Sequence, residues 1–308
     1  MRASEKLPPM TAAATDFRYP SVEVAVRGQD QLGETPLWCD REQTLWWVDI
    51  EKPKLQSFSP SKQAFESWDR DCTFLGSQAL TRSGRRLVAE DLSLKVLDTP
   101  DSLGDVLIEV DHELDNRLND GRVDARGHLW IGTMDNELHR PNGALYRIAP
   151  DGSSDRIMDG VIVSNGIAFA PDGSWMHFTD TRRHISYLFT LDPEDGAVTD
   201  KRVFADHSST GDRPDGACVD VDGCIWTAFF AGSRIVRYTP DGRIDRTIEL
   251  PVTNPTCLCF GGPDLSTLFV TTARKFLDER QLAEEPLAGS LLAIPGVGQG
   301  LPEHRFGL

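Results

Sequence analysis

The sequence lacks any apolar run long enough to cross a membrane as a helix, and its first twenty residues contain no hydrophobic segment typical of a secretory signal. Lysines and arginines are few: the sequence has 32 of them and 48 acidic residues, which gives a formal net charge of −16. Nucleic acids and anionic membranes are bound by clustered cations, so this balance disfavours both as partners. We therefore expect a cytoplasmic protein that binds a small molecule or a cation.

Paired cysteines are also missing. The six cysteines form no CxxC pair and follow no spacing typical of a secreted disulfide framework. Each lies in or beside an apolar run, so we expect reduced thiols in the core. The six are Cys39, Cys72, Cys218, Cys224, Cys257 and Cys259.

Several catalytic signatures are absent as well. The sequence contains no HExxH zinc motif, no GxSxG nucleophile elbow, no Walker loop and no GxGxxG fingerprint. A covalent serine mechanism and a nucleotide cofactor are therefore disfavoured.

What the chain does have is an internal repeat of a polar turn followed by an alternating aromatic or β-branched strand. Its copies begin at Asp40, Thr81, Asp124, Pro171, Asp220 and Pro263, at intervals of 41 to 49 residues. Alternation at period two indicates strands, and Asp-Gly turns indicate hairpins. Repeats of this length with room for four strands are typical of propeller blades. The sequence thus predicts an all-β, six-bladed β-propeller with four-stranded blades around a central channel.

The ends of the repeat array predict how the ring closes. A strand at 22–27 precedes the first blade and another at 290–294 follows the last, and pairing them in one blade would remove an open edge. Only 275–285 has the pattern of a helix. We expect residues 1–20 to be a flexible N-terminal segment and residues 21–308 to form a single propeller domain.

Polar residues open the innermost strands at corresponding places in several blades. Asn165 and Asp215 each precede Gly at identical spacing from the following turn, Asn119 stands one residue closer to its turn, and Glu34 precedes the first turn by six residues. Innermost strands surround the channel, so these side chains are expected to converge at one end of it. Two carboxylates and two amides are oxygen donors suited to Ca²⁺, Mg²⁺ or Mn²⁺, and a partly open site also accepts Zn²⁺ or Fe²⁺.

Each of these residues has a simpler interpretation when taken alone. Asn165 before Gly and Asp215 between Pro and Gly are typical turn residues, and Glu34 is typical of a loop carboxylate. Arg117, two residues before Asn119, points the same way in an extended strand and is a candidate to bind ligand hydroxyls or a developing oxyanion. The alternative is a surface arginine paired with an acidic neighbour. Placement at corresponding positions favours the metal site.

At these residues the sequence resembles the gluconolactonase and regucalcin (senescence marker protein) family of six-bladed propellers. The resemblance spans nearly the whole chain, in the order LGETPLW, RLNDGRVDARGHLWIGTM, NGALYRI, VSNGIAFAPDG, RPDGACVDVDGCIW, PTCLCFGG and LFVTTA. It implies a divalent ion bound by Glu34, Asn165 and Asp215.

The resemblance further implies that Arg117, Asn119 and Glu137 contact substrate. Glu137 follows the second strand of its blade and reaches the rim only if the loop after it folds inward. Family members open aldonolactones such as those of gluconate, arabinonate, xylonate or galactonate, whereas some animal members are discussed as calcium-regulating proteins.

The expected function is thus a metal-dependent lactonase that acts on a sugar lactone, as a monomer or small homo-oligomer. Asp215 is the first candidate for activating the attacking water, and a hydroxide on the ion oriented by Asp215 is the second. Two other functions remain open: a calcium-binding regulatory propeller without activity, and a metal-dependent esterase or phosphotriesterase.

Overall fold

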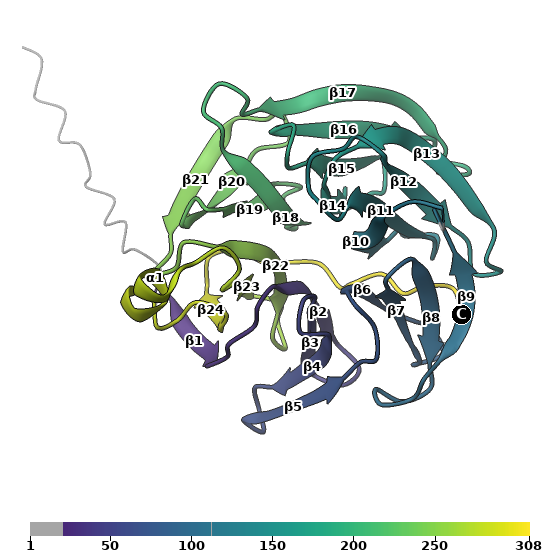
Figure 1. Cartoon of the computed structure of the whole chain (residues 1–308). Coiled ribbons are helices and arrows are strands. Elements are labelled where there is room, and N and C mark those ends of the chain that lie inside the picture. Colours follow the sequence, from purple (N-terminus) through teal and green to yellow (C-terminus); the bar gives the residue numbers. More distant parts are fainter. Residues whose placement is uncertain (1–20, 112) are drawn as a thin grey trace, which may run out of the picture.

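Six four-stranded antiparallel sheets surround a central channel (Figure 1). The computed structural model describes residues 21–111 and 113–308, so the predicted flexible segment 1–20 lies outside the described residues. The predicted six-bladed β-propeller with four-stranded blades is confirmed.

The blades follow one another along the chain, and each runs from its innermost to its outermost strand. The first contains β2 (Gly33–Cys39), β3 (Thr44–Asp49), β4 (Lys54–Ser59) and β5 (Ala64–Asp69). The second contains β6 (Leu75–Leu80), β7 (Arg86–Glu90), β8 (Ser93–Leu97) and β9 (Asp105–Glu109). The third contains β10 (Asn116–Val123), β11 (Leu129–Asp135), β12 (Gly143–Ile148) and β13 (Ser154–Val161).

The remaining three blades complete the ring. The fourth contains β14 (Ser164–Phe169), β15 (Trp175–Asp180), β16 (Ile185–Leu191) and β17 (Val198–Asp206). The fifth contains β18 (Arg213–Val219), β19 (Ile225–Phe230), β20 (Arg234–Tyr238) and β21 (Ile244–Glu249). The sixth contains β22 (Pro255–Gly261), β23 (Thr267–Thr272), β24 (Leu291–Pro295) and, outermost, β1 (Glu23–Val26).

The ring closes in the sixth blade. Strand β1 pairs antiparallel with β24, with Glu23 opposite Ala293 and Val24 opposite Leu292. Strands from the two ends of the repeat array thus share one sheet, as predicted.

In two of the repeats, a tryptophan on the strand is bonded to the aspartate of the preceding turn. Trp130 donates from its Nε1 to Asp124 Oδ2 over 3.0 Å, and Trp226 donates in the same way to Asp220 over 2.8 Å. Each aspartate opens the turn of its repeat, and each tryptophan lies on the following strand. The indole is therefore fully buried with its one polar group satisfied.

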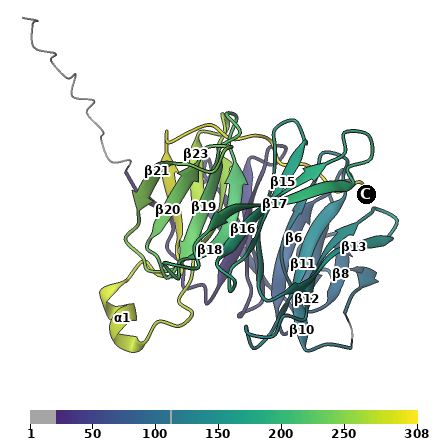
Figure 2. The ribbon, with the colours of Figure 1, turned by 90° about the horizontal axis from the view of Figure 1, so that it is seen from above.

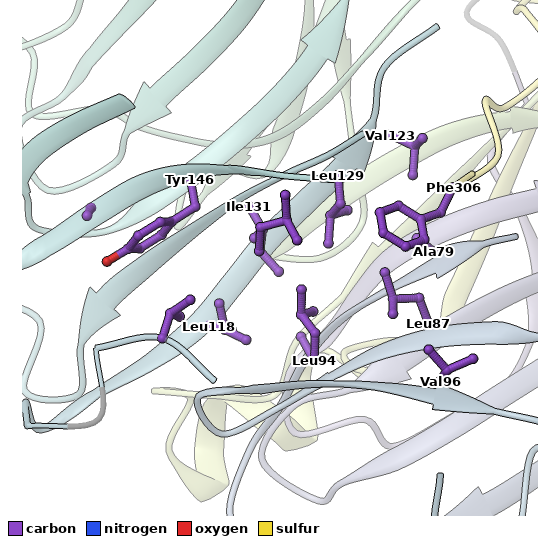
Figure 3. Packing of buried hydrophobic residues seen from close by; sticks show 14 residues of the cluster. Ala79, Leu87, Leu94, Val96, Leu118, Val123, Leu129, Ile131, Tyr146 and Phe306 are labelled. Carbon is purple, nitrogen blue, oxygen red and sulfur yellow. The ribbon is translucent and has the colours of Figure 1, made fainter. Parts of the chain in front are cut away.

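The core lies between adjacent blades. Between the second and third blades, Leu87 and Leu94 pack with Leu129 and Ile131, and Phe306 from the C-terminal segment joins them (Figure 3). All five are at most 2% exposed, and burying such a side chain contributes roughly 1.5–3 kcal/mol. All six cysteines are free thiols, as predicted. Five of them are buried, and Cys72 is partly exposed.

Helix α1 (Glu279–Glu284) is shorter than the predicted 275–285. Asp278 accepts a hydrogen bond from Gln281 N over 2.8 Å, and the Gln281 side chain accepts one from Asp278 N over 3.0 Å. This capping box starts the helix, and Phe276, at φ +65°, cannot belong to it.

The two ends of the channel are covered differently. Helix α1 projects from one end, whereas the C-terminal segment passes across the other (Figure 2). That segment is held by bridges from Phe306 to Thr81 and from Gly300 to Asp220. In the described part of the chain, no helix is long and apolar enough to cross a membrane.

Candidate metal and substrate site

An irregularity interrupts the start of every innermost strand. The register with the next strand shifts between Glu34 and Leu37 in β2, and between Asn165 and Ala168 in β14. Corresponding shifts occur in β6, β10, β18 and β22. A bulge bends the strand and re-aims side chains. Of the predicted site residues, Glu34, Asn119, Asn165 and Asp215 therefore lie at or within bulges and not in hairpin turns.

These residues line one cavity of about 290 Å³. Its lining comes from three sets of positions. The first set lies at the bulges and consists of Glu34, Asn119, Asn165 and Asp215. The second comes from positions two residues earlier and consists of Leu32, Arg117, Val163 and Arg213. The rim comes from the ends of second strands and the loops after them, and consists of Ile50, Met134, Leu138, Thr181, Arg182, Phe230, Lys275 and Phe276.

Two buried carboxylates dominate the electrostatics of the cavity. Glu34 is 4% exposed and Asp215 is 5% exposed. Burial, together with the charge of Asp120, raises the pKa of Glu34 to about 8. Burial and the charge of Glu34 raise the pKa of Asp215 well above its usual value. Without a cation, the two acids therefore oppose each other's ionisation.

Arg117 contributes a buried positive charge to the cavity. Its guanidinium is buried, which lowers its pKa to about 10, and Glu51, Glu34 and Asp215 oppose that shift. Nη1 donates to Leu118 O over 3.2 Å and also to Asn119 Oδ1. Arg117 is therefore a component of the cavity and not the surface arginine of the alternative interpretation.

A chain of hydrogen bonds continues from Arg117 through the two amides. Asn119 Nδ2 donates to Asn165 Oδ1 over 2.9 Å and to Ser164 O over 2.8 Å. Asn165 Nδ2 in turn donates to Thr181 Oγ1 over 2.9 Å. The amide planes of both asparagines are thus fixed, and Asn165 also lines the cavity that contains the two acids.

The donor set suits a divalent ion. No cluster of three His, Cys, Asp or Glu side chains arranged for a metal occurs among residues 21–111 and 113–308, so a thiolate or imidazole site finds no support there. Glu34 and Asp215 offer two carboxylates, and Asn165 offers an amide oxygen. Hard oxygen donors of this kind suit Ca²⁺, Mg²⁺ or Mn²⁺. A cation between them would also relieve the repulsion that raises both pKa values.

Glu137 is not among the residues that line the cavity. Its side chain is 63% exposed and lies 3.7 Å from His139 Nε2. Asp135 Oδ2 accepts hydrogen bonds from the backbone of His139 and Arg140, which closes a tight turn that directs Leu138, with φ +63°, into the lining. The contact of Glu137 with substrate stays a prediction.

Some lining residues were not anticipated from the sequence. Arg213 stands two residues before Asp215, as Arg117 stands two before Asn119, so strand alternation would have found it. Arg182 and Phe276 lie in loops after second strands, where no periodic signal exists.

Comparison with known proteins shows which family the chain belongs to. Residues 32–274 match the family model described as the SMP-30/gluconolactonase/LRE-like region. A 6-deoxy-6-sulfogluconolactonase of Pseudomonas putida is 36% identical over 290 residues, covering 91% of this chain and 98% of the relative. Regucalcin of Bos taurus is 32% identical over 293 residues, covering 92% and 98%.

Solved structures agree with these matches. The crystal structure of a calcium-binding protein, regucalcin, from Agrobacterium tumefaciens superposes with a TM-score of 0.88 at 29% identity, covering 94% of this chain and 98% of that one. The similarity thus extends over the entire propeller and includes the strands that carry the cavity. The chain belongs to the SMP-30/gluconolactonase/LRE-like family.

Proposed function

We propose that this protein is a metal-dependent lactonase that opens the lactone ring of a sugar acid. The observation that carries the proposal is the pair of buried, mutually repelling carboxylates, Glu34 and Asp215, beside the fixed amide of Asn165. The names of the relatives support it, because one is a sulfogluconolactonase and regucalcin is described in one solved structure as calcium-binding.

Glu34, Asn165 and Asp215 would hold the ion, with Ca²⁺, Mg²⁺, Mn²⁺, Zn²⁺ and Fe²⁺ as the candidates. When bound, such an ion polarises the lactone carbonyl and lowers the pKa of a water molecule. Its presence would also keep both acids ionised, because opposite charge favours the carboxylate form.

The chain's own residues account for the remaining chemistry. Asp215 accepts a proton from the attacking water as the new C–O bond forms at the carbonyl carbon. The bond from that carbon to the ring oxygen then breaks, and the proton passes to this oxygen, which leaves as a hydroxyl. Arg117 stabilises negative charge on the carbonyl oxygen, and Asn119 holds it in position through their shared hydrogen bond.

The lining of the cavity suits a polyhydroxylated ligand. Arg117 and Asn119 offer polar groups to it, while Leu32, Ile50 and Val163 supply apolar surface. A sugar ring has hydroxyls at its edge and C–H groups on its faces, so it matches both. An esterase or phosphotriesterase with an apolar substrate would leave the buried polar groups unpaired.

The test is a pH-indicator assay of the metal-free protein against a panel of glucono-, arabinono-, xylono- and galactonolactone, with each divalent ion restored in turn. We expect acid release only with an ion present, and its loss in Asp215→Ala while the circular dichroism spectrum is unchanged. Substantial hydrolysis by Asp215→Ala would remove Asp215 from the mechanism.

A calcium-binding protein without activity is the second candidate, favoured by the description of the Agrobacterium regucalcin. In that case a chelator would lower the melting temperature, Ca²⁺ would restore it, and no lactone in the panel would be hydrolysed. The same assay therefore separates the two functions.

A further inference from the structure

Two arginines at the cavity have no acidic partner. Arg182 and Arg213 both line it, and neither forms an ion pair within residues 21–111 and 113–308. Their sequence neighbours behave differently: Arg183 pairs with Asp180 at 3.2 Å, and Asp212 pairs with Arg234 at 2.9 Å. In a chain with a net charge of −16, carboxylates are plentiful, so two unpaired guanidiniums at one cavity need an explanation.

Two hydrogen bonds hold the segments of these arginines together. Thr181 Oγ1 donates to Pro214 O over 2.7 Å, and His184 Nδ1 donates to Asp212 O over 2.7 Å. In the sequence, Arg182 lies between Thr181 and His184, and Arg213 lies between Asp212 and Pro214. The backbone segments that carry the two arginines therefore adjoin at the boundary of the fourth and fifth blades, and both side chains line the same cavity.

Each arginine is also positioned individually. Arg182 donates from Nε to Leu138 O over 2.9 Å, which anchors the guanidinium and leaves its two terminal nitrogens for a ligand. Arg213 pairs with Phe230 at the start of β18, two residues before Asp215. The remaining cation of the rim, Lys275, already pairs with Glu51 and does not share this role.

We propose that the lactone substrate carries a second, anionic group, a sulfonate, phosphate or carboxylate, at the end of the sugar remote from the lactone carbonyl, and that Arg182 and Arg213 bind it. This inference rests on the proposed function, because it takes the part of the cavity around Glu34 and Asp215 as the place of the lactone. Guanidiniums form paired hydrogen bonds with the oxygens of all three groups.

The electrostatics of the cavity make the two arginines necessary for such a substrate. When a divalent ion offsets the charges of Glu34 and Asp215, an anionic group elsewhere on the substrate still loses its hydration on entering the cavity, and fixed cations near its own charge compensate for that loss. A neutral aldonolactone offers only hydroxyls to the two arginines, whereas an anionic group forms stronger, charge-assisted hydrogen bonds with them. Arg182 and Arg213 would therefore select the charge of the substrate, while the residues around Glu34 and Asp215 would open the lactone.

The experiment compares steady-state hydrolysis of gluconolactone with that of its analogues bearing a phosphate, a sulfonate or a carboxylate at carbon 6. The wild-type protein should prefer at least one charged lactone by about tenfold or more in kcat/KM. Arg182→Gln and Arg213→Gln should each reduce that preference by about tenfold, chiefly through KM, because the anion is held alike in the ground and transition states. The three charged lactones identify which anion is bound.

Arg202→Gln is the matched control. Arg202 is exposed on β17 of the fourth blade, does not line the cavity and has the same charge, so its replacement should leave the preference unchanged. A wild-type protein that hydrolyses the neutral lactone as efficiently as every charged one would overturn the anion site and leave the proposed function standing.

Calorimetric binding tests the inference even if no lactone is hydrolysed, an outcome that would contradict the proposed function alone. Binding of 6-phosphogluconate is compared with that of gluconate. Tighter binding of the phosphorylated acid that is lost in Arg182→Gln and Arg213→Gln supports the anion site. Equal binding of the two acids, together with no preference among lactones, overturns it.

Discussion

Asn165 donates a hydrogen bond from Nδ2 to Oγ1 of Thr181 over 2.9 Å. The single hydroxyl proton of Thr181 is already directed to Pro214 O, 2.7 Å away, so the threonine oxygen can act only as an acceptor toward Asn165. The amide of Asn165 must therefore turn its nitrogen to Thr181, while its Oδ1 accepts a hydrogen bond from Asn119 Nδ2 over 2.9 Å. The hydroxyl of Thr181 thus fixes which end of the Asn165 amide is the oxygen acceptor, the group that a divalent ion requires.

Thr181→Val tests this relationship, because valine keeps the shape of threonine and removes the hydroxyl. We expect the dissociation constant of the divalent ion to rise by roughly 10–100-fold, as is typical when a residue that orients a ligand is lost. The free energy of unfolding should also fall by about 1–3 kcal/mol, because a buried amide and a buried carbonyl lose their partner.

Thr181→Ser is the control for that substitution, since serine retains the hydroxyl. Its ion affinity, measured by calorimetry on chelator-treated protein, should stay near the wild-type value. Equal affinities for the valine and serine variants would show that Thr181 does not orient Asn165.

The two buried acids predict a pH dependence of the metal-free protein. The pKa of Glu34 is raised to about 8 and that of Asp215 is raised in the same direction, so the folded state binds more protons than the unfolded state between about pH 4.5 and 8. Stability therefore decreases as pH rises through this range. Urea unfolding of chelator-treated protein at pH 5, 6.5 and 8 measures the decrease.

Asp215→Asn should flatten that profile, because it removes one of the buried carboxylates whose pKa is raised. At pH 8 the metal-free variant is expected to be more stable than the metal-free wild type, yet to gain nothing from added Ca²⁺. Wild-type protein should gain more from the ion at pH 8 than at pH 6, since binding displaces protons from the acids. A variant with the same slope as the wild type would contradict the electrostatic coupling.

Gly166 lies close to the backbone of Asp215 in the next blade. It follows Asn165 with φ +62°, and a Cβ there would lie 2.9 Å from Asp215 O and 2.8 Å from Thr179 Oγ1. Gly166→Ala should therefore weaken ion binding and lower the free energy of unfolding by about 1–3 kcal/mol, through strain and overpacking together.

Gly173→Ala isolates the strain. Gly173 lies in the same blade at φ +72°, and a Cβ there would meet nothing within 4 Å. This variant should lose about 1 kcal/mol of stability and keep its ion affinity. If both alanine variants bind the ion like the wild type, the close approach of Gly166 to Asp215 does not position the site.

The sequence was sufficient for the blades because their determinants are local. Alternation and the turn aspartates, such as Asp124 six residues before Trp130, specify each repeat within about ten residues of chain. Once the blades are placed in a ring, the convergence of Glu34, Asn165 and Asp215 follows from their equivalent positions. These parts of the site depend on register alone.

The parts that escaped prediction depend on loops. The turn at Asp135 places Leu138 and not Glu137 at the cavity, and no periodic pattern foretells which side chain such a turn directs inward. Arg182 reaches the rim because its loop is tied to the next blade through Thr181 and Pro214. Such contacts join residues far apart in the chain, so only the assembled structure reveals them.

The C-terminal segment offers a last prediction, on stability at the end of the channel opposite the cavity. Phe306 is fully buried between the second and third blades, and its backbone bonds to Leu80 O over 2.8 Å and to Arg82 N over 2.9 Å. Glu303 pairs with the buried Arg122 at 2.7 Å. The C-terminal segment therefore links the second and third blades, and none of its residues lines the cavity.

Phe306→Ala should lower the free energy of unfolding by about 3–5 kcal/mol, because it leaves a cavity where a phenyl ring was packed. Phe306→Leu should lose less, since most of that volume remains filled. At temperatures well below the melting transition, both variants should retain the ion affinity of the wild type, measured by calorimetry. Loss of ion binding by the folded alanine variant would show that the two ends of the channel are coupled, and that the innermost strands transmit the disturbance from Phe306 to Glu34 and Asp215.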